Sequence, residues 1–165
     1  MDLTEDTTMS SKTKIPREVG TLAIDLGNST TVVAFQGEKD EEPKLLDLPP
    51  ISRTQGEIPS LVWHSGSKER PNVLIGQQVL KAELSEKEKV NICSDFKRWI
   101  GCTNPPLQSL SNVLPEEAGE YLIQQIWENL PSKLLIKRLV LTAPVETYRA
   151  YRTWLVDSCH LLPVD

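Results

Sequence analysis

One short stretch of this 165-residue chain combines residue types that could hold a phosphate chain and a divalent cation. Residues 23–34 read AIDLGNSTTVVA. An apolar segment runs into Asp25, turns through Gly27 and small polar residues, and leaves as a second apolar segment. A carboxylate there could hold Mg²⁺ directly or through water, and a glycine at positive φ would let consecutive N–H groups face an anion. A plain hairpin is the alternative, because Asp, Gly and Asn favour turns on conformational grounds alone.

Hydroxyl groups add to the chemistry of this turn, since Ser29, Thr30 and Thr31 follow it. Two further segments carry candidate residues. In DFKRWIG (residues 95–101), Lys97 could meet a phosphate or an attacking water, although cations followed by glycine also mark an ordinary helix end. In LVLTAP (residues 139–144), Thr142 would lie at the carboxyl end of a strand, where open α/β sheets bind ligands. A strand that simply stops at proline is the alternative there.

Composition narrows the classes of partner. The chain is 39% hydrophobic and 25% charged, as expected for a globular protein, and its net charge of -5 argues against nucleic acid. No apolar run approaches the roughly 18 residues that span a bilayer, so we expect no membrane insertion. Three cysteines without a CxxC pair predict reduced thiols, and the lack of an apolar N-terminal segment predicts a cytoplasmic location.

The pattern along the chain predicts three regions. Polar residues 1–18 predict a disordered leader. Residues 19–26, 31–35 and 44–48 predict consecutive strands of an antiparallel meander. Residues 51–112 have the texture of an inserted α+β subdomain, with apolar pieces at 58–63 and 73–75, a charged helix at 81–97 and a loop at 103–112.

The last third predicts a helix, a strand and a second helix. Helical periodicity covers residues 115–130, and an apolar strand buried on both faces is expected at 139–143. A helix at 146–162 would turn four side chains inward, namely Tyr148, Tyr151, Leu155 and Cys159. The fold class is α/β, with a core of residues 19–50 plus 113–165 and the smaller subdomain at 51–112. Because the order of elements looks unfinished, we expect a fragment of a longer protein.

Six segments, in order from about residue 20, together resemble the ATPase domain of the heat shock protein 70 chaperone family, within the actin-like ATPase superfamily. They are IDLGNST with VVA, IPSLV (residues 58–62), VLIGQ (73–77), FKRWIG (96–101), the helix start PEE (115–117) and LVLTAP. The resemblance implies an RNase-H-like lobe I, ATP or ADP with Mg²⁺ as ligands, and a role in protein folding under stress. Unfolded peptide clients and co-chaperones would be partners through domains outside this chain.

The resemblance also implies roles for matching residues. Asp25 would organise the Mg²⁺ water shell. Lys97 would meet the γ-phosphate and the attacking water. Thr142 and the turn residues Gly27, Asn28, Ser29 and Thr30 would hold phosphates. Pro144 and Arg152 would form a switch that relays the nucleotide state to a peptide-binding domain.

Departures from the family pattern keep other functions open. Asn28 and Ser29 replace two threonines, and residues 145–147 read VET where the family has AYF. The second phosphate motif and the adenosine motif do not occur in this sequence, so we expect weak nucleotide binding and no turnover by this chain alone. A non-catalytic interaction module with the same fold, or another actin-like branch such as a sugar kinase or filament protein, are the alternatives.

Overall fold

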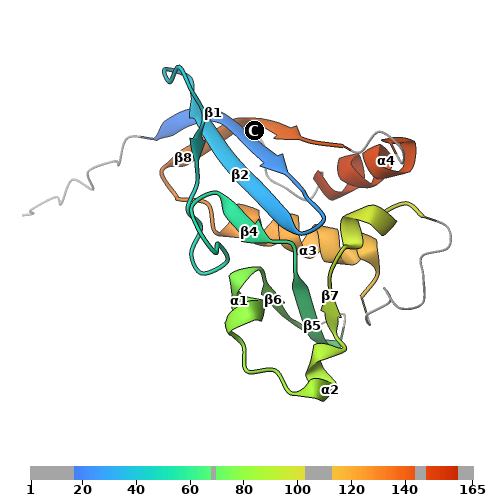
Figure 1. Cartoon of the computed structure of the whole chain (residues 1–165). Helices are drawn as coiled ribbons and strands as arrows, with labels where there is room; N and C mark the ends of the chain where they lie inside the picture. The colour runs from blue at the N-terminus through green and yellow to red at the C-terminus, as the bar shows by residue number, and fades with distance from the viewer. Residues whose placement is uncertain (1–16, 68–69, 103–112, 144–147, 160–165) are drawn as a thin grey trace, which may run out of the picture.

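Alternating burial defines the first two strands, β1 (Glu18–Asp25) and β2 (Thr30–Gly37). Leu22 and Ile24 of β1 and Val33 and Phe35 of β2 are buried, while the residues between them are more exposed. This period of two places one face of the hairpin against the core. The computed structural model describes residues 17–67, 70–102, 113–143 and 148–159 (Figure 1).

The first sheet has five strands. Its order is β3-β2-β1-β8, with β4 also paired to β2; the added strands are β3 (Lys44–Leu45), β4 (Glu57–Pro59) and β8 (Leu134–Leu141). β1, β2 and β3 pair antiparallel, which confirms the predicted meander, although β3 is shorter than expected. β8 runs parallel to β1, so both strands end at the same edge of the sheet. The fold is mixed α/β.

β8 differs from its prediction. It begins at Leu134, and the expectation of a strand buried on both faces is wrong, since Val140 is 46% exposed. Lys137 and Arg138 are exposed as well, and only Ile136 is buried. Among the described residues β8 pairs with β1 alone and therefore lies at the edge of the sheet, where fewer neighbours cover the side chains.

A second, antiparallel sheet of three strands has the order β6-β5-β7. Its strands are β5 (Val62–Ser67), β6 (Arg70–Ile75) and β7 (Ile92–Cys93). The short helix α1 (Gln77–Lys81) follows β6. β4 lies between the two sheets in sequence and pairs with β2 of the first sheet, so the chain crosses from one sheet to the other at residues 60–61.

The charged helix predicted at residues 81–97 is wrong. That stretch forms α2 (Glu86–Lys89), then β7, then the 3₁₀ helix η1 (Phe96–Trp99). Glu88 accepts hydrogen bonds from the backbone and hydroxyl of Ser85, which starts α2, but the four helical residues are all exposed. A helix with no apolar face gains little stability from packing. The strand β7 instead pairs with β5, and in this pair Cys93 lies opposite Val62 with both residues buried.

The two remaining helices agree with their predicted positions. α3 (Pro115–Glu128) buries one stripe, formed by Ala118, Leu122, Ile123 and Ile126. α4 (Tyr148–Cys159) turns Tyr151, Trp154 and Leu155 inward. The side chains of Tyr148 and Cys159 lie outside the described residues, as do most of the predicted leader and the loop at 103–112.

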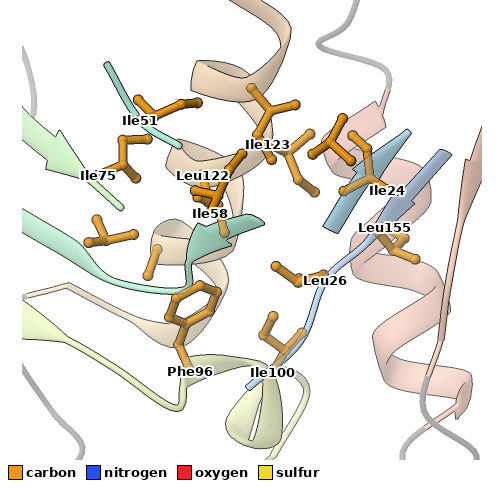
Figure 2. Close-up of a cluster of buried hydrophobic side chains, with 14 of the residues drawn as sticks. Ile24, Leu26, Ile51, Ile58, Ile75, Phe96, Ile100, Leu122, Ile123 and Leu155 are labelled. Atoms are coloured by element: carbon orange, nitrogen blue, oxygen red, sulfur yellow. The ribbon is translucent and has the colours of Figure 1, made fainter. Parts of the chain in front are cut away.

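The core joins both sheets through α3. Figure 2 shows Leu122 and Ile123 at the middle of a continuous apolar cluster, with Ile24 of β1 on one side and Ile75 of β6 on the other. Leu155 of α4 lies beside Ile24 in the same view. The cluster therefore fixes the end of β1 against α3 and α4 together. No helix in the described parts of the chain has the length and apolar character needed to cross a membrane.

Candidate functional site

The candidate site lies where β1 ends. Asp25 is the last residue of β1, is exposed, and pairs in register with Val32 of β2. Its neighbours Ile24 and Leu26 are buried, each at 1% exposure. Side chains alternate between the core and the surface here, so the carboxylate of Asp25 points outward while its two neighbours are held in the core. The end of β1 therefore presents one acid in a fixed position.

Gly27 serves a different purpose from the one predicted. Its φ is not in the left-handed region. A Cβ atom at Gly27 would instead lie 2.1 Å from the backbone oxygen of Thr30. The turn therefore requires glycine because the backbone passes close to itself, which the sequence alone could not distinguish from a need for positive φ.

The other turn residues differ in accessibility. Asn28 and Ser29 are exposed, whereas Gly27 and Thr30 are half-buried. The expected hydroxyl of Thr31 is not available to a ligand, because Thr31 is fully buried and its Oγ1 lies 2.9 Å from Oγ of Ser60. Thr31 faces the core since side chains alternate along β2.

Ser60 fixes the turn and was missed by sequence reasoning as a supporting residue. Its backbone N–H donates to the carbonyl of Ser29 over 2.9 Å, and its hydroxyl pairs with Thr31. Ser60 is 1% exposed. The signal that could have revealed it is a small hydroxyl residue inside an otherwise apolar segment, where a buried polar group needs a partner.

Thr142 lies next to Asp25, although the two residues are far apart in the sequence. Its Oγ1 donates a hydrogen bond to Oδ1 of Asp25 over 2.5 Å, and its backbone N–H donates to the carbonyl of Ile24 over 3.3 Å. The parallel pairing of Ile24 with Leu141 produces this contact, because it sets the following residue of each strand side by side. The structure thus brings together two residues that sequence analysis selected separately.

Tyr151 lies on the inward face of α4 and was not among the predicted site residues. It was predicted as an inward-facing helix residue, and it is indeed fully buried. Its pKa is raised above the ordinary value by burial and then by the negative charge of Asp25. The phenol of α4 therefore belongs to the electrostatic surroundings of Asp25. A tyrosine at an inward helix position was the available signal, since its hydroxyl needs a polar neighbour.

Lys97 lies on η1 and is half-buried. Within the described residues, Lys97 makes no ion pair with Asp25 or with any other acidic residue. Its helix is nevertheless anchored near the site: Ile100 lies beside Leu26 in Figure 2, and Gly101 (φ +77°) approaches α4 so closely that a Cβ atom would lie 2.5 Å from Cβ of Ala150. Gly101 ends η1 as the helix-end interpretation of this segment predicts.

Of the two predicted switch residues, Arg152 alone lies within the described residues. Arg152 is exposed on α4 and borders a surface hollow of about 580 Å³ with Arg149, Thr153, Val156 and Asp157. Pro144 lies outside the described residues. A second hollow, of about 490 Å³, lies between Gly20, Gly37 and Lys137 at the opposite end of the first sheet, so it is separate from the candidate site.

The donors at the site suit a phosphate-bound cation. In the described residues no group of three or more His, Cys, Asp or Glu side chains could hold a metal ion. Mg²⁺ commonly keeps several waters and is held by one or two carboxylates together with phosphate oxygens. A single fixed carboxylate beside exposed turn residues matches that mode of binding and does not match an all-protein metal cage.

Comparison with known proteins adds no family: no protein-family model matches the chain, and a search of curated proteins finds no match.

Proposed function

We propose that this chain forms one wall of the Mg-ATP site of a heat-shock-protein-70-like chaperone ATPase. The observation that carries the proposal is the hydrogen bond from Thr142 to Asp25, which fixes a lone exposed carboxylate at the end of β1. Beside it lies a turn with two exposed small polar residues, Asn28 and Ser29. Phosphoryl transfer needs mainly positioning and charge stabilisation, which such a site can contribute.

The sheet topology supports this proposal. An RNase-H-like lobe of the actin-like type requires an antiparallel three-stranded meander extended by a further strand beside its first strand. The order β3-β2-β1-β8 has that form. Helices α3 and α4 contribute the side chains that cover the first sheet at the end where Asp25 lies.

Each residue has a proposed role. Asp25 holds the water shell of Mg²⁺, and Thr142 orients the carboxylate and contacts phosphate. The turn residues Gly27, Asn28, Ser29 and Thr30 hold phosphate oxygens through backbone N–H groups and side chains. Lys97 stabilises the γ-phosphate and the attacking water. When bound, Mg²⁺ would neutralise phosphate charge.

The wider biology follows from the resemblance alone. We propose that ATP hydrolysis drives binding and release of unfolded peptides, that co-chaperones act on the same cycle, and that the protein works in the cytoplasm. Pro144 and Arg152 would transmit the nucleotide state.

The test is a titration of this chain with Mg-ATP, Mg-ADP and Mg-pyrophosphate. Binding is measured by calorimetry and by the shifts of backbone amide signals in NMR. We expect weak, Mg²⁺-dependent binding that shifts the amides of residues 26–30. Asp25→Asn should abolish the Mg²⁺ dependence, whereas Asp47→Asn, at an exposed carboxylate beyond β3, should not. If the affinity is the same without Mg²⁺ and in Asp25→Asn, the proposed site is refuted. A sub-micromolar dissociation constant would refute the weak affinity that we expect.

A non-catalytic module is the second candidate, favoured by Asn28 in place of threonine at an exposed turn position. Measuring ATP hydrolysis by the full-length protein separates the two. The ATPase proposal expects Lys97→Ala to remove most activity while Lys39→Ala, at an exposed residue of the β2–β3 connection, retains it. Equal rates for wild type and Lys97→Ala would favour the module.

A further inference from the structure

A surface hollow of about 490 Å³ lies on the first sheet, at the opposite end of β1 from Asp25. Two glycines contribute to its lining: Gly20 of β1 pairs in register with Gly37 of β2, and both are buried. Glycines inside strands are often found at bulges and where a ligand approaches the backbone. The volume is within the range of sites that hold small organic molecules.

A β-bulge in β8 brings two cations to this hollow. Thr21 of β1 pairs with Arg138, whereas the preceding residue of β1 pairs with Ile136, so Lys137 is an extra residue in β8. In a regular strand, Arg138 would face the same side as Ile136, which is buried. The extra residue turns Arg138 to the other face, and both Lys137 and Arg138 are exposed and line the hollow.

All but one of the charged side chains that line the hollow have an opposite charge beside them. Nζ of Lys137 lies 2.8 Å from Oε1 of Glu38. Oδ2 of Asp40 lies 3.1 Å from Nζ of Lys44. Arg138 makes no ion pair with any residue in the described parts of the chain. Its guanidinium is therefore the charge in this hollow that a ligand could neutralise.

A hydroxyl group lies on the strand beside this guanidinium. Thr21 is half-buried, lines the hollow and is the register partner of Arg138; its Oγ1 makes no hydrogen bond to another described residue. Another part of the lining is held in place, because Nε2 of Gln36 donates to the carbonyls of Asp40 and Glu41, each over 3.2 Å. The hollow thus combines a fixed lining with two polar groups that are available to a ligand.

We propose that this hollow binds a small carboxylic acid, whose carboxylate is held by the guanidinium of Arg138 and the hydroxyl of Thr21. A guanidinium presents N–H donors in a fork that matches the two oxygens of a carboxylate. One unpaired positive charge matches a singly charged group, and the carboxylates of Glu38 and Asp40 would repel a doubly charged phosphate more strongly. The proposal does not depend on the Mg-ATP site, which lies at the other end of β1.

The experiment is an NMR titration of this chain with sodium acetate at constant ionic strength. Acetamide, a neutral molecule of the same shape, and inorganic phosphate are titrated in parallel. We expect acetate to shift the backbone amide signals of Gly20, Thr21 and Gly37, and to leave those of residues 26–30 unchanged. Acetamide should shift none of them, because it lacks the charge that Arg138 attracts.

Two substitutions test the proposed contacts. Arg138→Gln removes the charge-assisted hydrogen bonds and should raise the dissociation constant for acetate roughly tenfold or more. Thr21→Val keeps the shape of the side chain and should raise it about threefold to tenfold. Arg98→Gln is the matched control, since Arg98 is exposed on η1 and does not line the hollow. Thermal melts of each variant show whether the fold is retained.

A second measurement uses the wild-type protein and does not depend on the folding of a variant. Phenylglyoxal modifies accessible arginine side chains, and peptide mass spectrometry reports the extent of reaction at each arginine. Acetate should slow the modification of Arg138, whereas Arg98 should react at the same rate with and without acetate. Acetamide should protect neither residue.

Four results would overturn the inference. If Arg138→Gln melts as wild type does and binds acetate equally well, the guanidinium does not hold the carboxylate. If acetamide shifts the same amides as acetate, the hollow does not select a negative charge. If phosphate shifts these amides and acetate does not, the ligand is not a carboxylic acid. If acetate neither shifts these amides nor protects Arg138, the hollow is not a binding site for a carboxylate.

Discussion

Thr142 and Asp25 are 117 residues apart, yet the hydroxyl of Thr142 donates to Oδ1 of Asp25 over 2.5 Å. Parallel pairing of β8 with β1 is the cause, because it brings the carboxyl ends of both strands to one edge of the sheet. The contact orients a carboxylate that is otherwise exposed to solvent. It is the point from which the proposed site can be tested most directly.

Removing this hydroxyl should weaken ligand binding more than it weakens the fold. We expect Thr142→Val to raise the dissociation constant for Mg-pyrophosphate about fivefold to tenfold, given about 1–1.5 kcal/mol for the lost orientation. Both residues are exposed, so the free energy of unfolding should change little. Thr142→Ser keeps the hydroxyl and should bind as wild type does. Equal affinity in the Val and Ser variants would contradict the proposed role.

The buried pair of Thr31 and Ser60 should behave as one unit. Ser60→Ala leaves the Thr31 hydroxyl buried without its partner, which should cost about 1–3 kcal/mol of unfolding free energy in urea. Thr31→Val alone should cost a similar amount. The double variant should be more stable than the sum of the two losses predicts, because neither hydroxyl is then left unpaired. Strict additivity would show that the two groups do not depend on each other.

Gly27 should not tolerate a side chain. In Gly27→Ala the new Cβ would meet the backbone oxygen of Thr30 at 2.1 Å, and backbone cannot move aside as a flexible side chain can. We expect a loss of about 1–3 kcal/mol in unfolding free energy together with weaker Mg²⁺-dependent binding. Asn28→Ala, at the exposed neighbouring position, is the control and should leave stability within about 0.5 kcal/mol of wild type. A stable Gly27→Ala variant would show that the turn relaxes.

Glu120 on α3 should make stability depend on pH. Burial raises its pKa above the ordinary 4.5; a hydrogen bond from Ser158 on α4 opposes the rise, and the charges of Glu117, Glu116 and Asp157 add to it. A raised folded-state pKa means that the stabilising contribution is complete below pH 4.5 and is lost as pH rises through the folded value. Glu120→Gln should therefore melt higher than wild type at pH 7.

That advantage should shrink at pH 4, where Glu120 is largely protonated in both states. Thermal melts of the two proteins at pH 4 and pH 7 provide the measurement. Glu41→Gln, at an exposed residue, is the control and should show no such difference between the two pH values. An advantage of Glu120→Gln that is the same at both pH values would rule out ionisation as its cause.

Local pattern was sufficient for several elements. Apolar segments on either side of a polar turn predicted β1 and β2, and helical periodicity predicted α3 and α4 within a few residues. These signals work because each element buries one face of its own side chains. The same reasoning failed for residues 81–97, where charges suited a helix but β7 gained burial by pairing with β5, a choice that depends on a distant partner.

By itself, the sequence determined which residues could do chemistry: an acid at a strand end, a glycine turn and a threonine two residues before a proline. Their residue types and neighbours are local properties. Only the tertiary structure decided which of them meet. Parallel pairing joined Thr142 to Asp25, and the alternation of side chains along β2 buried Thr31 against Ser60. Contacts across such sequence separations depend on how whole elements pack, and no local pattern encodes that.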